Sequence, residues 1–302
     1  MTPQFLADGL IAGAMIGLGA IGVTLTYSIL RFANFAHGEF ISFGAYATLL
    51  IAAAIGAAFA GSAEAIGPFS FGWGIVAAGL GAMILTGALA LALDFLLFAR
   101  LRQKGAAITT VMASFGASMA LRALLEFAFT SRPVYFSRDL QIAMPIGFGM
   151  RVTADQIALL ALTALLLAGV QALLTRTQAG RAMRAVAENP VLARVAGVDV
   201  DGVIRAVWLI GGALACASGI MLGLIVQIRP FMGFDLLLPL FAAAILGGIG
   251  SVPGAIAGAL IVGIGEAAAV QIVGAEWRAA VAFLLLIGVL LIKPTGLFGR
   301  AD

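Results

Sequence analysis

The chain has 302 residues, of which 63% are hydrophobic and 10% are charged, and its mean hydropathy is +1.14. A typical soluble domain carries about 25% charged residues, so the composition excludes an ordinary soluble protein. The formal net charge of +3 does not indicate a nucleic-acid partner, because the basic residues fall in short loops between apolar runs, where they orient a membrane protein. Cys216 is the single cysteine, which excludes a disulfide within the chain.

Apolar runs cover most of the chain. Roughly 20 apolar residues suffice to cross a bilayer as a helix, and continuous rather than alternating apolarity argues against a β-barrel. The uncharged runs are residues 9–30, 40–63, 65–93, 105–121, 156–175, 206–228 and 236–265, with a shorter one at 279–292. They predict an all-α, polytopic protein of the lipid bilayer, with about 8–9 transmembrane or half-membrane helices and broken segments.

Basic residues predict the orientation of these helices, because Lys and Arg in short loops resist translocation. The segment 175–205 holds five arginines and is taken as cytoplasmic. Counting back from it places Arg31 and residues 100–104 inside and the N-terminus outside. The segment 131–151, with three arginines, then lies outside, against the rule.

The first apolar run is interpreted as a retained helix, because residues 1–8 contain no Lys or Arg and a secretory signal needs a positively charged start. Small residues recur at every fourth position in this run and again near the end of the chain, which suits close approach of helix backbones. They predict either tight packing within one bundle or a dimerising face. These positions are Gly9, Gly13 and Gly17, and Ala255, Ala259 and Gly263.

The stretch "RFANFAHGEFISFGAY", residues 31–46, contains the only histidine of the chain. On a continuous helix His37 and Glu39 would point about 200° apart, so they could not share one proton or ligand. Asn34 is a favoured N-cap, and a helix starting after it would place Glu39 near its positive end. The stretch therefore predicts a helix end, a tight cytoplasmic-side turn and a new helix start.

Two interpretations of this stretch stay open. In the first, His37 and Glu39 lie at the headgroup level and only cap a helix. In the second, Asn34, His37, Gly38 and Glu39 line or gate a polar path, because ionisable groups at membrane depth cost about 2.5–3.5 kcal/mol each and are usually retained for a task.

Two further charge patterns within the apolar runs predict local pairing. Arg122 and Glu126 are spaced i, i+4 and are expected to pair on one helix. Asp94 lies a turn or two before Arg100 and is expected to reach the membrane interface.

The cytoplasmic segment is rich in helix formers up to "ENP", where Pro190 ends the first helix. Arg181, Arg184 and Glu188 are spaced i, i+3, i+7 and share one face. The pattern predicts two short cytoplasmic helices; a solvated amphipathic surface loop is the alternative.

The run 236–265 is too long for one straight crossing, since thirty helical residues span about 45 Å and the hydrocarbon core is about 30 Å thick. Gly247, Gly250, Pro253 and Gly254 predict a break within it. Broken helices at membrane depth are tolerated where they line a cavity, so these residues are also candidates for the path or gate. Glu266 follows the break with no basic residue near it in sequence and is a further candidate.

Several catalytic motifs are absent from the sequence. Neither lysine, Lys104 or Lys293, ends a phosphate-binding G-x-x-x-x-G-K-[ST] loop. One histidine and one cysteine cannot build a conventional His/Cys metal site, and Ser114 lacks the G-x-S-x-G context of a hydrolase. We therefore expect no enzymatic activity and no cofactor in this chain.

Three segments together resemble one family. "NFAHGEFISFGAY", "TQAGRAMRAVAENPVLARVAGVDVDGVIRAVW" and "LGGIGSVPGAIAGALIVGIGE", followed by "KPTGLFGR", are similar to the LivH-type permease subunits of branched-chain amino acid ABC importers and occur in the same order. The resemblance implies the ABC importer permease fold, a single transmembrane permease domain over residues 1–302 with a cytoplasmic coupling loop at about 175–205, and a multi-pass location in the bacterial inner (cytoplasmic) membrane.

The resemblance also implies partners and roles. The partners would be a LivM-like permease subunit, two ATP-binding subunits that hydrolyse ATP, and a periplasmic solute-binding protein. The solute would be a branched-chain amino acid or a related small solute, such as another amino acid, urea, an amide or an organic acid; the sequence does not choose among them. The residues that would contact the ATP-binding subunit are Gly180, Arg181, Arg184, Glu188 and Asn189.

Two other functions fit the sequence. A self-contained secondary transporter or channel would relay protons through Glu39, His37 and Glu266. A scaffolding membrane subunit would tolerate replacement of the polar residues around His37 without loss of transport.

Overall fold

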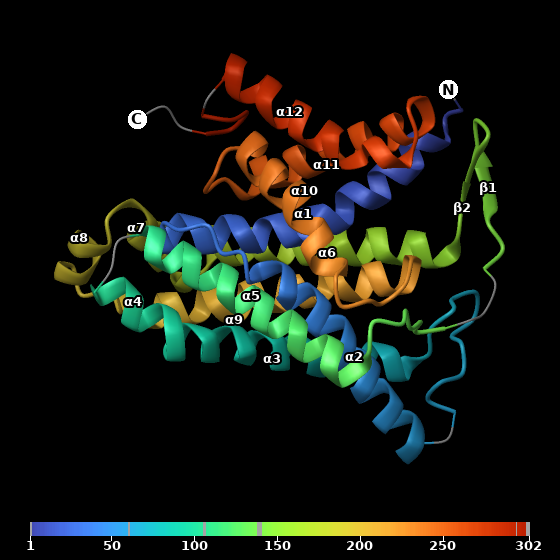
Figure 1. Cartoon of the computed structure of the whole chain (residues 1–302), viewed down its shortest axis with the longest axis horizontal. Coiled ribbons are helices and arrows are strands. Elements are labelled where there is room, and N and C mark those ends of the chain that lie inside the picture. Colours follow the sequence, from blue (N-terminus) through green and yellow to red (C-terminus); the bar gives the residue numbers. More distant parts are fainter. Residues whose placement is uncertain (1, 60, 105–106, 138–140, 294, 300–302) are drawn as a thin grey trace.

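Helices, most of them apolar, make up the greater part of the computed structural model, which describes residues 2–59, 61–104, 107–137, 141–293 and 295–299 (Figure 1). The elements in chain order are α1 (Gln4–Leu30), α2 (His37–Ala58), α3 (Trp73–Leu93), a π-helical turn (Asp94–Phe98), α4 (Ala99–Lys104), α5 (Ala107–Phe129), β1 (Met144–Gly147), β2 (Met150–Val152), α6 (Ala154–Arg176), α7 (Gln178–Glu188), α8 (Pro190–Val195), α9 (Val200–Ile225), α10 (Met232–Gly247), α11 (Val252–Ile272), a 3₁₀ turn (Ala275–Trp277) and α12 (Arg278–Ile292). The two strands form an antiparallel hairpin.

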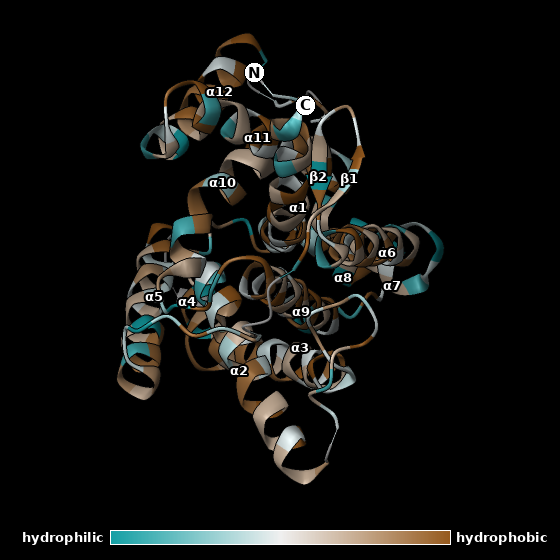
Figure 2. Cartoon of the chain, turned by 90° about the vertical axis from the view of Figure 1, so that its right-hand side faces the viewer, coloured by the Kyte–Doolittle hydropathy of each residue, from teal (hydrophilic) through white to brown (hydrophobic). Residues whose placement is uncertain are grey.

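Within the described residues, eight helical segments are long and apolar enough to cross a membrane: α1, α2, α3 with its continuation to Arg102, α5, α6, α9, α11, and α12 with the turn before it. The apolar helix α10 is shorter. Figure 2 shows hydrophobic colours along most of these helices. The predicted all-α, polytopic fold with 8–9 membrane-embedded segments is confirmed.

Helix α1 lies at the centre, with α10, α11 and α12 on one side and α2, α3 and α9 on the other (Figures 1 and 2). Glycines let α1 and α11 touch at backbone distance: a Cβ on Gly9 would lie 2.6 Å from the Cα of Ile264, and one on Gly13 would lie 3.0 Å from the carbonyl oxygen of Ala259. The small-residue faces predicted on these two helices therefore pack against each other within one bundle.

The two ends of the bundle differ. Helices α7 and α8 lie at one end, and the β1–β2 hairpin lies at the other (Figure 1). Arg31, at the end of α1, donates to the carbonyl oxygen of Ala187 in α7 at 2.5 Å. Gln4, at the start of α1, exchanges hydrogen bonds of 2.8 and 3.0 Å with the backbone of Arg151. Residues 131–137 and 141–151 thus lie at the end opposite to α7 and α8, which agrees with the side that the basic-residue count predicted for this segment.

The long run 236–265 is broken where the glycines predicted. Helix α10 ends at Gly247, and Gly248 and Gly250 follow with φ angles of +97° and +93°, which glycine adopts without strain. Ser251 then caps α11 by accepting a hydrogen bond from the backbone N–H of Gly254 at 3.1 Å. Pro253 lies in the first turn of α11, where its missing N–H is harmless, so it begins the second helix rather than ending the first.

Candidate functional site

The connection between α1 and α2 re-enters the bundle. Helix α1 ends at Leu30, but the Nε2 atom of His37 lies 3.1 Å from the carbonyl oxygen of Gly19, eleven residues before that end. Eleven helical residues correspond to about 16 Å. His37 is 1% exposed. The predicted helix end and new helix start are present, but helix α2 begins inside the protein, so the connection is not a tight turn at the end of the bundle.

Asn34 does not cap α2 as predicted. Its side-chain oxygen accepts a hydrogen bond from the backbone N–H of Ala36 at 3.1 Å, and the helix starts only at His37. Asn commonly bonds the backbone two residues on in this way, which stabilises a turn instead of a helix start. The neighbouring N–H of Phe35 donates to Ser114 in α5 at 3.1 Å. The re-entrant segment is thus held by its own turn and by α5.

Glu39 forms a buried ion pair with Arg122 of α5. The carboxylate is fully buried, and its Oε1 atom accepts from Arg122 at 2.6 and 3.1 Å and from Ser118 at 3.0 Å. The predicted local pair of Arg122 with Glu126 is therefore wrong, because tertiary packing brings a carboxylate from another helix to Arg122. Glu39 faces α5 while His37 faces α1, so the two do not share a proton, as their spacing predicted.

Arg122 also contacts the start of α10. Its guanidinium carbon lies 4.0 Å from the ring centroid of Phe234 and 4.9 Å from that of Phe231. Cations placed over aromatic faces within about 6 Å are attracted by the ring quadrupole. One arginine therefore joins α5, α2 and α10.

Gly38 allows α2 and α10 to cross closely. A Cβ at Gly38 would lie 2.7 Å from the carbonyl oxygen of Gly233 and 2.8 Å from the Cγ atom of Leu237. Ser42, one turn further, donates to the carbonyl oxygen of Pro230 at 2.9 Å and accepts from the N–H of Gly233 at 3.0 Å. Two helix starts therefore meet inside the protein, beside the Glu39–Arg122 pair.

The predicted break residues Gly247, Gly250, Pro253 and Gly254 lie at the other end of α10, which is 16 residues long, or about 24 Å. The C-terminal segment covers this turn: the N–H of Leu297 donates to the carbonyl oxygen of Leu246 at 2.8 Å, and that of Phe298 donates to Gly247 at 3.0 Å. The break residues and the residues around Glu39 are therefore separate groups.

Glu266 is paired, contrary to the expectation from sequence. Its carboxylate is buried and accepts a hydrogen bond at 2.8 Å from Arg278, because α12 folds back along α11. Glu266 therefore lies with α12, whereas Glu39 lies with α5 and α10. Among the described residues, no group of three or more His, Cys, Asp or Glu side chains is placed to hold a metal ion.

Helix α7 is amphipathic. Arg181, Arg184 and Glu188 are exposed, as their common face predicted, whereas Gly180 is buried on the side that meets α6. A Cβ on Gly180 would collide with two carbonyl oxygens of α6, so this glycine lets α7 pack directly against the end of that helix. Arg184 also donates to the carbonyl oxygen of Leu174 in α6.

Helix α8 presents apolar side chains to solvent. Asn189 separates it from α7 and caps it, accepting hydrogen bonds from the N–H groups of Val191 and Leu192 at 3.0 Å each. Val191, Leu192 and Val195 are between 65% and 82% exposed. The two predicted helices are present, and the second one carries an uncovered apolar surface.

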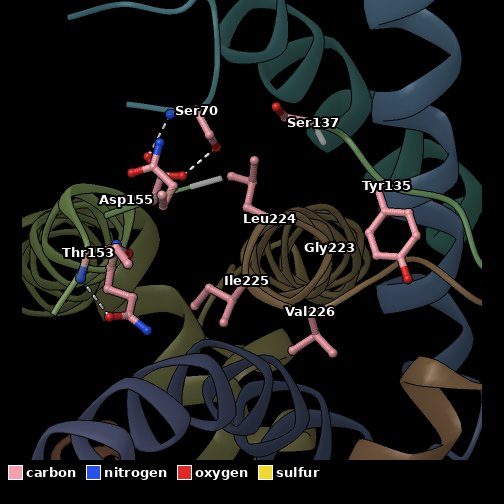
Figure 3. Close-up of a pocket in the computed structure, with 11 residues that line it drawn as sticks. Ser70, Tyr135, Ser137, Thr153, Asp155, Gly223, Leu224, Ile225 and Val226 are labelled. Carbon is pink, nitrogen blue, oxygen red and sulfur yellow. Dashed lines mark hydrogen bonds between the residues drawn. The ribbon is translucent and has the colours of Figure 1, made fainter. Parts of the chain in front are cut away.

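A cavity of about 460 Å³ lies at the end of the bundle opposite to α7 and α8, and Figure 3 shows residues that line it. It is bounded by the start of α6, the end of α9 and the loops that follow α2 and α5. Asp155 lines it, is 4% exposed, and accepts hydrogen bonds from the backbone N–H of Ser70 at 2.9 Å and from its hydroxyl. Sequence reasoning missed this site because its residues are far apart in the chain; the one local signal is the capping box in which Thr153 and Gln156 begin α6.

Comparisons with known proteins agree over nearly the whole chain. Residues 5–290 match the sequence profile of a family described as the permease component of branched-chain amino acid transport systems. The high-affinity branched-chain amino acid permease LivH of Escherichia coli K12 is 33% identical over 314 residues, covering 100% of this chain and 99% of LivH. BraD of Pseudomonas aeruginosa, described in the same terms, is 31% identical and covers 99% of this chain and 96% of its own. A solved structure of PsaBC from Streptococcus pneumoniae covers 97% of this chain and 93% of its own, but its 13% identity and TM-score of 0.46 are too low to add to the argument.

Proposed function

The chain belongs to the family of permease components of branched-chain amino acid transport systems and is a membrane-spanning ABC importer permease. On this premise we propose how it couples to its partners. A full-length family match favours this function over a self-contained secondary transporter or channel. We propose a bacterial inner membrane complex with a LivM-like permease subunit, two ATP-binding subunits that hydrolyse ATP, and a periplasmic solute-binding protein.

The observation that supports coupling is the exposed surface of α7 and α8. Charged residues of α7 lie beside an uncovered apolar patch on α8. We name the two groups together the coupling surface; its residues are Arg181, Arg184, Glu188, Val191, Leu192 and Val195. Soluble surfaces rarely leave large aliphatic residues grouped and uncovered unless a partner covers them. An apolar centre with charged residues around it is typical of protein interfaces. We assign this surface to an ATP-binding subunit.

The packing of α7 supports transmission into the membrane helices. It contacts α1, α6 and α9 directly. Arg31 adds a side-chain contact from the end of α1, and Arg184 adds one to α6. A displacement of α7 by an ATP-binding subunit would therefore act on three membrane helices at once, which is how a permease could shift between inward- and outward-open states.

For the path, we propose that Asn34, His37, Gly38 and Glu39 form a gate where α2 and α10 begin. The support is that both helices start inside the protein, since interrupted helices at membrane depth are tolerated where they line a cavity or path. Gly247, Gly250, Pro253 and Gly254 would act as a hinge at the far end of α10. Glu266, the remaining candidate for the path, is already paired with Arg278, so its charge is not free to attract a solute.

The test is uptake and ATP hydrolysis by the complete importer in proteoliposomes, with Arg184→Glu and Glu188→Lys. We expect both variants to insert normally but to lose binding-protein-stimulated ATP hydrolysis and copurification of the ATP-binding subunits. Arg132→Glu is the matched control, because it reverses an exposed charge that follows the end of α5, at the opposite end of the bundle. Copurification and stimulated hydrolysis that survive both coupling-surface changes would show that the docking site lies elsewhere.

A further inference from the structure

The cavity at the end opposite to the coupling surface combines polar and apolar walls. Asp155, Thr153 and Gln156 come from the start of α6, and Leu224 and Ile225 come from the last turn of α9. Figure 3 shows Leu224 between Asp155 and the axis of α9. A volume of about 460 Å³ is within the range of small-molecule sites, which are roughly 300–1,000 Å³. The cavity therefore has the size and the mixed lining that suit a small amphipathic solute.

Asp155 differs from the other buried acidic residues of the bundle. Glu39, Asp94 and Glu266 each pair with an arginine, at 2.6, 2.5 and 2.8 Å respectively. Within the described ranges, no Lys or Arg nitrogen lies within 4.0 Å of the Asp155 carboxylate, whose hydrogen bonds come from Ser70 and which lies in the first turn of α6, near the positive end of that helix. A buried carboxylate is costly unless a cation and hydrogen bonds satisfy it. Two hydrogen bonds leave lone pairs on both oxygens for another donor.

The end of α9 adds negative potential to the same cavity. Residues 223–226 line it, and the last carbonyl groups of a helix have no intrahelical partners. They also carry the negative end of the helix dipole, which favours a cation close by. A carboxylate and a helix C-terminus therefore meet at one small space, beside the apolar side chains of Leu224 and Ile225.

We propose that this cavity binds the ammonium group of a small zwitterionic amino acid. Asp155 and the final carbonyls of α9 hold the ammonium group, and Leu224 and Ile225 contact the apolar side chain of the solute. This inference rests on the proposed function, and it adds an entry site on this chain for the solute that a binding protein delivers. Ser70 has a positioning role, since it orients the carboxylate.

The test is binding of radiolabelled leucine to the purified importer in nanodiscs without the solute-binding protein, together with ATP-dependent uptake by the complete system. Asp155→Asn keeps the shape and can keep the bonds to Ser70 but removes the charge. We expect it to weaken leucine binding at least about tenfold, the size expected for losing one charge-assisted hydrogen bond. Asp8→Asn is the matched control and should leave binding unchanged, because it makes the same change at an exposed carboxylate that does not line the cavity.

A second arm uses 4-methyl-2-oxopentanoate, which has the carbon skeleton of leucine but no ammonium group. It should compete poorly, whereas leucine amide, which keeps the ammonium group, should compete. Equal binding by Asp155→Asn and the wild type would overturn the proposal. So would an equal loss in Asp8→Asn, or strong competition by the keto acid. Normal ATP-dependent uptake without any leucine binding to the permease would overturn this site and leave the proposed function standing. Absence of uptake with all partners present would instead count against the proposed function.

Discussion

The buried pair of Glu39 and Arg122 provides a quantitative test of how α2, α5 and α10 are held together. Arg122→Gln leaves a carboxylate that is fully buried and has lost its cation. Breaking one partner of a buried ion pair costs about 3–5 kcal/mol. The Oε2 atom of Glu39 already has no hydrogen-bond partner among the described residues, so little remains to compensate the charge. We therefore expect Arg122→Gln to lower the free energy of unfolding by about 3–5 kcal/mol.

Glu39→Gln should cost less, about 1.5–3 kcal/mol, the usual contribution of a hydrogen bond to a charged group. Arg122 would keep Phe231 and Phe234 against its guanidinium, and its side chain is 13% exposed. In the double variant the two neutral amides can bond each other, and no buried charge is left. Its loss should therefore be smaller than the sum of the single losses, with a coupling energy of about 0.5–3 kcal/mol.

The measurement is reversible unfolding in mixed detergent micelles, followed by circular dichroism for the wild type, both single variants and the double variant. Arg122→Gln combined with Arg132→Gln is the control cycle, because distant sites add within about 0.5 kcal/mol. Additive losses for Glu39 and Arg122 would refute the pairing. If the double variant is stable and transports at the wild-type rate, the pairing is still supported, but Glu39 has no role in the proposed gate.

Two other variants test the contacts around this pair. Gly38→Ala should destabilise the protein by about 1–3 kcal/mol, because the new methyl group meets the backbone of Gly233. Gly56→Ala is the control: a Cβ there meets nothing within 4 Å, so we expect no loss of stability in the same unfolding assay. Arg31→Gln removes the hydrogen bond from α1 to Ala187. We expect stimulated ATP hydrolysis to continue while uptake per ATP falls a few-fold; unchanged uptake per ATP would show that this contact does not transmit the movement of α7.

Local rules predicted the helices and their breaks well. Apolar length alone predicted the membrane-embedded segments, and the glycines around Gly247 located the break between α10 and α11, because these signals depend on residues adjacent in the chain. The face shared by Arg181, Arg184 and Glu188 is likewise a property of one helix. The four-residue spacing of Gly9, Gly13 and Gly17 predicted a close contact but not its partner, which is α11.

Pairings between distant residues could not be predicted in the same way. Arg122 is four residues from Glu126, yet it binds Glu39, which is 83 residues away. Glu266 lacks a basic neighbour on its own helix but gains Arg278 when α12 folds back. The depth of His37 also escaped prediction, because charge patterns mark where a chain leaves the bilayer but not where an extended segment returns into the protein. The same reasoning explains why the cavity at Asp155 was missed.

Helix α1 links the two regions that the sequence had marked separately. At its end, Arg31 contacts α7, and halfway along it, Gly19 and Gly22 receive the side chain of His37. Gly22 has no side chain that could keep the imidazole away, so the start of α2 lies directly against α1. A packed route is not by itself proof of coupling, which requires an element with two arrangements. The start of α2 suits that role, because its six-residue connection to α1 is not helical and Arg122 holds it through one charge. Movement of α1 relative to α5 would therefore act on the contact between His37 and α1 and on the Glu39–Arg122 pair together.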